Sequence, residues 1–141
     1  MANKDVLLGY YEYFGKNDFA SMKANSFAPD IVWTMPGQHP MSGKMVGADA
    51  VIAFLKQLYT AGIRVDKIHL GELDNGVLVE KHTGHGKVGN EEFIFPTVTT
   101  YAFKDGKISE VQVHNGDPIA ANRFFWLAFK LKDIPARLSD K

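Results

Sequence analysis

The second half of the chain is dominated by four extended segments joined by three tight turns. The turns are Asp-Asn-Gly at 74–76, Val-Gly-Asn at 88–90 and Lys-Asp-Gly at 104–106, which is chemistry expected of antiparallel hairpins. The segments that they connect span residues 63–73, 77–88, 92–103 and 107–114. This pattern predicts a meander of four antiparallel strands.

The first half of the chain carries helical spacing instead. A first helix ending at Gly15 is predicted by an i, i+3, i+4, i+7 stripe of Leu7, Tyr10, Tyr11 and Phe14. A second short helix begins at Asn17-Asp18, and a third ends at Gly62 after a stripe of Val51, Leu55, Leu58 and Tyr59. Between them we expect a strand over 31–35 and a non-repetitive loop over 38–45. Helices followed by a meander indicate an α+β fold rather than alternating βαβ units.

A last helix is predicted after the meander. Asp117-Pro118 has the composition of an N-cap followed by a first-turn proline, and an aromatic face of Phe124, Phe125 and Trp126 follows. We expect residues 1–141 to form a single domain, with residues 131–141 as a mobile tail.

Composition excludes several classes of function. Sixteen basic residues balance sixteen acidic ones, so no overall field would attract nucleic acid or an anionic membrane. The chain has no cysteine, which excludes disulfides, thiolate nucleophiles and thiolate metal sites. We see no signal peptide and no apolar run of the roughly 20 residues that span a bilayer, so we expect a cytoplasmic protein. Near-zero net charge does not oppose self-association, and we expect a homodimer.

Three motifs carry a resemblance to a known family. They are W-T-M-P-G-x-x-P-x-S-G-x-x-x-G at Trp33–Gly47, D-G-K-I-S-E at Asp105–Glu110, and D-P-x-A followed by F-F-W between Asp117 and Trp126. In this order they resemble the SnoaL-like branch of the nuclear-transport-factor-2-like superfamily, which includes ketosteroid isomerases, polyketide cyclases and limonene-epoxide hydrolases. The resemblance implies a curved, antiparallel or mixed sheet wrapped around helices, a cone-shaped barrel with one internal pocket.

The resemblance also implies chemistry by a pocket acid or base on apolar carbonyl compounds or epoxides. The positions that hold the catalytic residues of limonene-epoxide hydrolases do not match, because they carry Val32, Thr34, Lys81, Thr83 and Val113 here. We therefore do not expect epoxide hydrolysis by that mechanism.

Strand alternation suggests which residues line the pocket. The most apolar and aromatic combination is the face with Phe95, Thr97, Thr99, Tyr101 and Phe103 together with Val111 and Val113, so we assign it to the concave side. On the same reading Lys81, Thr83, His85 and Asn115 also face the pocket. Glu80, His82, Glu110, Gln112 and His114 would then lie on the convex face.

The candidate catalytic residues are Tyr101, His85 and Asp117. Tyr101 would donate to a developing enolate, while His85 or Asp117 moves a proton. The candidate ligand-binding residues are Trp33, His39, Lys81, Thr83, Phe95, Thr99, Val111, Val113 and Asn115. Some of these have structural alternatives: Asp117 as a helix cap, Trp33 as a core residue with its indole N–H bonded to a loop, and His39 as an exposed loop residue rather than a guard of the pocket mouth.

No metal and no other cofactor is predicted. His82 and His85 are three apart on a predicted strand, so their rings point to opposite faces and cannot share an ion. Three functions remain open: acid–base chemistry on a hydrophobic carbonyl compound, binding of an apolar small molecule without turnover, and a homodimeric interaction domain. For the first two we expect an apolar cavity of roughly 300–1,000 Å³.

Overall fold

The computed structural model describes residues 2–129, which form four helices and one sheet of six strands. The helices are α1 (Asn3–Gly15), α2 (Phe19–Ser26), α3 (Ala48–Thr60) and α4 (Pro118–Ala128). The strands are β1 (Phe27–Met35), β2 (Gly43–Val46), β3 (Arg64–Glu72), β4 (Leu78–Val88), β5 (Glu91–Lys104) and β6 (Lys107–Asn115). The α+β prediction is therefore confirmed, whereas the prediction for residues 131–141 lies outside the described residues.

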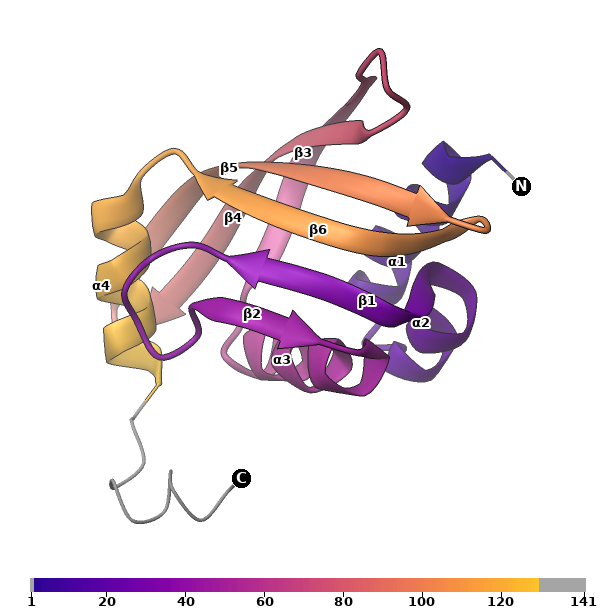
Figure 1. The fold of residues 1–141 in the computed structure, drawn as a ribbon. Coiled ribbons are helices and arrows are strands. Elements are labelled where there is room, and N and C mark those ends of the chain that lie inside the picture. The colour runs from indigo at the N-terminus through magenta and orange to yellow at the C-terminus, as the bar shows by residue number, and fades with distance from the viewer. Residues whose placement is uncertain (1, 130–141) are drawn as a thin grey trace.

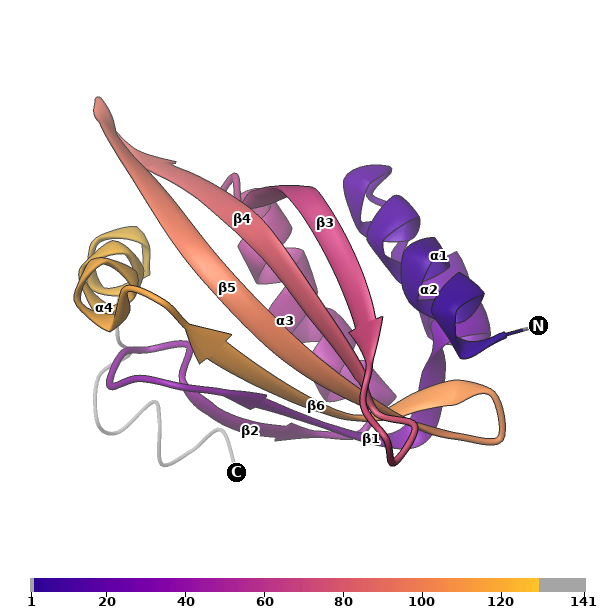
Figure 2. The ribbon, with the colours of Figure 1, turned by 90° about the horizontal axis from the view of Figure 1, so that it is seen from above.

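The sheet is mixed, curved and open. Its strand order is β2-β1-β6-β5-β4-β3, with β1 parallel to β6 and every other neighbouring pair antiparallel. The strands twist strongly from one edge to the other (Figure 2). Because β2 and β3 remain unpaired edges, the sheet curls around the helices without closing into a barrel.

Strand β2 is an element that the sequence reading missed. Residues 43–45 lie within the segment that we expected to be a loop, yet residues 43–46 pair with β1 from Val32↔Val46 to Met35↔Gly43. Gly43 and Gly47 bound this short strand with φ angles of +109° and +93°, which residues with a side chain rarely adopt. The two glycines thus let the chain turn into and out of a four-residue edge strand.

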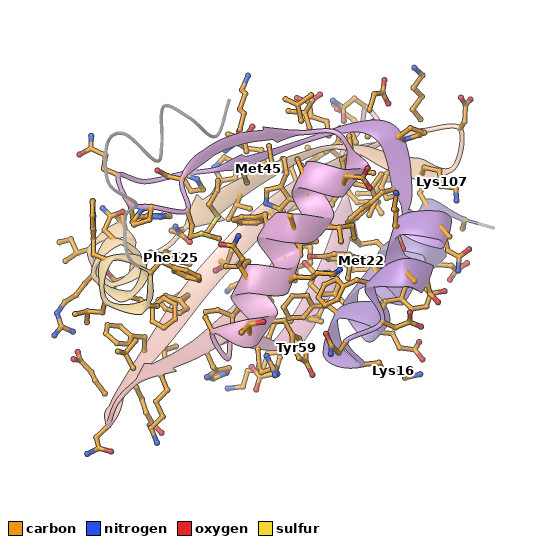
Figure 3. All side chains as sticks on the ribbon, turned by 90° about the horizontal axis from the view of Figure 1, so that it is seen from below. Lys16, Met22, Met45, Tyr59, Lys107 and Phe125 are labelled. Atoms are coloured by element: carbon orange, nitrogen blue, oxygen red, sulfur yellow. The ribbon has the colours of Figure 1, made fainter. Side chains whose placement is uncertain are left out.

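The helices all lie on the concave side of the sheet. Figure 1 shows α4 at one end of the strands and the α1–α2 pair at the other, and Figure 3 shows α3 crossing between them. Side-chain caps fix two helix starts, because Asp18 accepts from the Ser21 N–H at 3.1 Å and Asp117 accepts from the Ala120 N–H at 3.0 Å. None of the helices within residues 2–129 is long and apolar enough to cross a bilayer.

Candidate functional site

A partly enclosed cavity of about 90 Å³ lies between the concave face of the sheet and the helices. Side chains of α1, α3 and α4 form one wall, and strands β1, β3, β4, β5 and β6 form the other. The predicted volume of roughly 300–1,000 Å³ is therefore wrong. The space is smaller because aromatic side chains of the helices, among them Tyr10, Phe14 and Phe54, project into the hollow of the sheet.

The strand register identifies the residues that form the cavity floor. Directly opposed residues of an antiparallel pair share a face. His82 is paired with Thr97, and Thr97 with Asn115, so these three form one row across β4, β5 and β6. Glu80, Thr99 and Val113 form the next row in the same way. The inner-face residues of β4 therefore include Glu80, His82 and Gly84, of which His82 and Gly84 line the cavity and Glu80 is buried beside it.

The predicted face of β4 is wrong as a result. Lys81, Thr83 and His85 lie on the outer face of the sheet, with Lys81 exposed and the other two half-buried. His85 is bonded there to Asp66 across β3, its Nε2 lying 2.9 Å from Oδ1. His85 therefore cannot act on a compound held at Tyr101, and none of these three residues lines the cavity.

Two glycines explain why the pattern of polar and apolar residues along β4 gave the wrong face. Gly84 and Gly86 follow His82 at every second position of β4 and therefore lie on the same inner face, where large aromatic rings pack on them. A Cβ added at Gly86 would lie 2.6 Å from Cε1 of Phe124, and one at Gly84 would lie 3.4 Å from Cβ of Phe95. The residues of β4 on the inner face are thus not hydrophobic themselves, because Phe95 and Phe124 of neighbouring elements fill the space over the two glycines.

Glu80 and His82 form a buried pair at the floor of the cavity. The Glu80 side chain has no solvent exposure, and its two carboxylate oxygens lie 2.8 and 2.6 Å from Nδ1 of His82. The His82 side chain, 11% exposed, lines the cavity. A carboxylate on Nδ1 selects the tautomer with the proton on that nitrogen, so Nε2 is left with its lone pair. The pair has the composition and geometry of an oriented general base.

Two tyrosine hydroxyls meet beside this pair. The hydroxyl oxygens of Tyr11 and Tyr101 lie 2.6 Å apart, and the Tyr11 ring also contacts the edge of the His82 ring, with centroids 6.1 Å apart. Burial is the main cause that raises the pKa of both tyrosines well above the usual value, and nearby Tyr10 and Glu80 add to the rise. Both hydroxyls therefore keep their protons near neutral pH. One of the two hydroxyl protons forms the hydrogen bond between Tyr11 and Tyr101, and the other remains available to a ligand.

The loop after β1 contains His39 and lies outside the residues that line the cavity. His39 is only 6% exposed, stacks on Phe125 at 4.3 Å and accepts the Met41 N–H at Nδ1. Its Nε2 lies 3.0 Å from the Pro36 carbonyl oxygen, so both ring nitrogens are satisfied by the backbone. Burial lowers the pKa of His39. His39 is therefore a packed residue of the loop, and neither the exposed alternative nor a position at the pocket mouth is correct.

The structure separates the remaining candidates into three groups. Trp33, Phe95, Thr99, Tyr101, Val113 and Asn115 all line the cavity. Val111 is fully buried in the core but is not part of the cavity wall. Asp117 is an exposed helix cap outside the cavity, as its structural alternative predicted. The bond expected between the Trp33 indole and a loop is not formed, because Nε1 is buried without a partner among residues 2–129.

Comparison with known proteins places the chain in a family. A model of the SnoaL-like domain matches residues 7–111. The chain belongs to the SnoaL-like family. No curated protein matches the sequence closely enough to count as a relative.

Solved structures agree with this family assignment. Bal32a, from a soil-derived mobile gene cassette, superposes with a TM-score of 0.82 at 19% identity over 87% of this chain and 95% of its own. An NTF2-like protein of unknown function from Burkholderia pseudomallei gives 0.76 at 25% identity over 89% and 98%. A protein proposed to be a polyketide cyclase, from Xanthomonas campestris, gives 0.70 at 19% identity over 85% and 95%. These likenesses establish the NTF2-like fold of this SnoaL-like chain.

Proposed function

We propose that this SnoaL-like protein is an enzyme that moves a proton on a small, hydrophobic carbonyl compound, with His82 as the general base. The observation that carries the proposal is the buried Glu80 carboxylate on Nδ1 of a histidine that lines the cavity. In this tautomer the unprotonated ring nitrogen is the one that can accept a proton from a ligand.

The chemistry follows from the position of the base. Nε2 of His82 takes a proton from the carbon next to the carbonyl group, and the electrons of that C–H bond form an enolate. The positive charge that His82 gains is stabilised by the Glu80 carboxylate behind it. Return of the proton to a different carbon isomerises the compound, and attack by the enolate carbon on a second carbonyl group of the same molecule closes a ring.

The tyrosine pair suits the stabilisation of the enolate oxygen. Of the two hydroxyls of Tyr11 and Tyr101, the one that accepts the mutual hydrogen bond still has its own proton to donate. Donation within the pair polarises the accepting hydroxyl and strengthens its outward bond. Such donors in a largely apolar site contribute most when they meet charge that develops during the reaction.

The experiment that tests this proposal needs no knowledge of the natural substrate. Cyclohexanone in D₂O exchanges its α-hydrogens when a base removes them, and ¹H NMR follows the loss of signal. We expect wild-type protein to accelerate the exchange and His82→Gln to reduce the acceleration by about a hundredfold or more. Tyr101→Phe should also slow it, because one donor to the enolate is removed.

His85→Gln provides the matched control, since it removes a histidine from the outer face of the same strand. It should retain the wild-type rate. An equal loss in His85→Gln and His82→Gln, or no acceleration by the wild-type protein, contradicts the proposal.

Binding without turnover is the second candidate function. It is favoured by the mutual bond of the two tyrosine hydroxyls and by the bond of His82 to Glu80, because these groups are already satisfied in part. The same experiment separates the two functions. A probe that shifts the NMR signals of Tyr101 while its α-hydrogens exchange no faster than in buffer would favour binding alone.

A further inference from the structure

Asn115 provides a polar group at the far side of the cavity from the base. It lies in the row His82–Thr97–Asn115, two strands away from His82. Adjacent strands are about 4.8 Å apart, so the Cα atoms of His82 and Asn115 are separated by about 10 Å across the cavity floor. The two residues thus face a ligand from opposite sides.

The Asn115 side chain is available to a ligand, although its backbone is fixed. It is half-buried and lines the cavity, and within residues 2–129 its amide forms no hydrogen bond. The backbone around it is held by a 2.7 Å bond from the Gly116 N–H to the Pro96 carbonyl. The neighbouring Thr97 hydroxyl is already engaged, donating to the Phe95 carbonyl at 3.0 Å. A fixed strand end with a free amide is the arrangement expected of a binding group.

The charge of the cavity limits the ligands that suit it. Glu80 brings a buried carboxylate to the floor, and no lysine or arginine is found among the cavity-lining residues of the described chain. An anionic ligand would therefore meet a negative charge in a site with few polar atoms, which is unfavourable. An uncharged ligand avoids this repulsion.

Resting on the proposed function, we infer that the substrate is an uncharged compound of about one ring with two oxygen functions. Its carbonyl oxygen is bound by the Tyr11–Tyr101 pair beside His82, and a second oxygen at the opposite side of the ring is bound by the Asn115 amide. The small cavity of about 90 Å³ suits a compound of this size. Asn115 is then a specificity-determining residue.

The test compares three probes, each measured by NMR titration. Cyclohexanone has one oxygen function, 4-hydroxycyclohexanone adds the second, and 4-oxocyclohexanecarboxylate places a negative charge at that position. We expect wild-type protein to bind 4-hydroxycyclohexanone about three- to tenfold more tightly than cyclohexanone, the effect of one net hydrogen bond. The carboxylate probe should bind more weakly than either.

Two variants assign the effect to Asn115. Asn115→Leu should abolish the preference for the hydroxylated probe, measured as the ratio of the dissociation constants of the two uncharged probes for the same variant. Gln112→Leu removes an amide from the outer face of the same strand and should keep the preference. A preference that survives in Asn115→Leu, or is lost in Gln112→Leu, overturns the assignment.

The remaining outcomes separate this inference from the function on which it rests. If cyclohexanone undergoes catalysed exchange but both uncharged probes bind equally, the Asn115 subsite is overturned and the role of His82 stands. Tightest binding of the carboxylate probe overturns the requirement for an uncharged substrate. If none of the three probes binds, both the subsite and the proposed function are overturned.

Discussion

Gly86→Ala tests the packing of α4 against the inner face of the sheet. The added methyl carbon would lie 2.6 Å from Cε1 and 2.9 Å from Cζ of Phe124, a ring with no solvent exposure. Non-bonded carbon atoms prefer roughly 3.5–4.0 Å, so the ring or the strand must move by about 1 Å. Overpacking of this kind costs about 1–3 kcal/mol, and the smaller entropy of unfolded alanine recovers about 0.4–1 kcal/mol.

The expected net loss is about 1–2 kcal/mol. For a domain of 141 residues it lowers Tm by about 3–7 °C, which differential scanning calorimetry resolves. Gly71→Ala is the matched control, since Gly71 lies in β3 and an added Cβ there meets nothing within 4 Å. This control should melt at or slightly above the wild-type temperature.

A second substitution shows whether Phe124 is the cause. Phe124→Leu alone leaves a cavity and destabilises the protein. In the Gly86→Ala background it also relieves the clash, so the two changes should couple favourably by about 1 kcal/mol. The packing argument is refuted if Gly86→Ala melts like Gly71→Ala, or if the two substitutions are additive.

Three further predictions concern a cap, a buried histidine and the outer face of the sheet. Asp117→Ala should cost about 1 kcal/mol in urea unfolding, and Asp117→Asn much less, because asparagine also caps. Burial lowers the pKa of His39, so its contribution to stability is present above the ordinary value of 6.5 and is lost as the pH falls below that value. Tm should therefore fall on acidification, and it should fall less steeply in His39→Gln. Equal slopes of Tm against pH in the two proteins would contradict this prediction. We propose a homodimer through the outer face of the sheet, which no helix of residues 2–129 covers (Figure 2). Light scattering at tens of micromolar protein should show a dimer for the wild type and a monomer for Val98→Glu. A monomeric wild type contradicts the proposal.

The sequence predicted those parts of the fold that depend on local chemistry. The three hairpin turns, the helix start at Asp117 and the helix end near Gly62 each have a cause within a few residues, and the structure has each of them. Strand β2 was missed because its four residues have no alternating pattern of their own. It exists because β1 offers an unpaired edge, which is a tertiary cause.

The candidate site was harder to predict because strand faces are decided by neighbours. Both faces of β4 carry polar residues, so the hydrophobicity of its sequence does not indicate which face is buried. The useful signal was the pair Gly84 and Gly86, because two glycines on one face of a strand indicate that large side chains pack against it. Combined with the many phenylalanines of the chain, this signal would have turned His82 inward and His85 outward.

The contribution of the helices was also underestimated. Tyr10 and Tyr11 were interpreted as part of an apolar stripe, which accounts for the helix and for the burial of Tyr10. The stripe does not reveal that Tyr11 reaches the hydroxyl of Tyr101, 90 residues away in sequence. Spacing within one element cannot show such a contact, because it depends on how α1 sits across the sheet.

The Glu80–His82 pair is better explained by the proposed function than by stability. A fully buried carboxylate loses its hydration, and a single histidine partner restores only part of that loss. Apolar residues of similar volume often stabilise a core as well as such a pair or better. The neighbouring floor position Val113 shows that this part of the sheet accommodates an apolar side chain. Packing alone therefore gives no reason for this buried acid, whereas the proposed function does, because it needs an acid that orients His82 at the cavity.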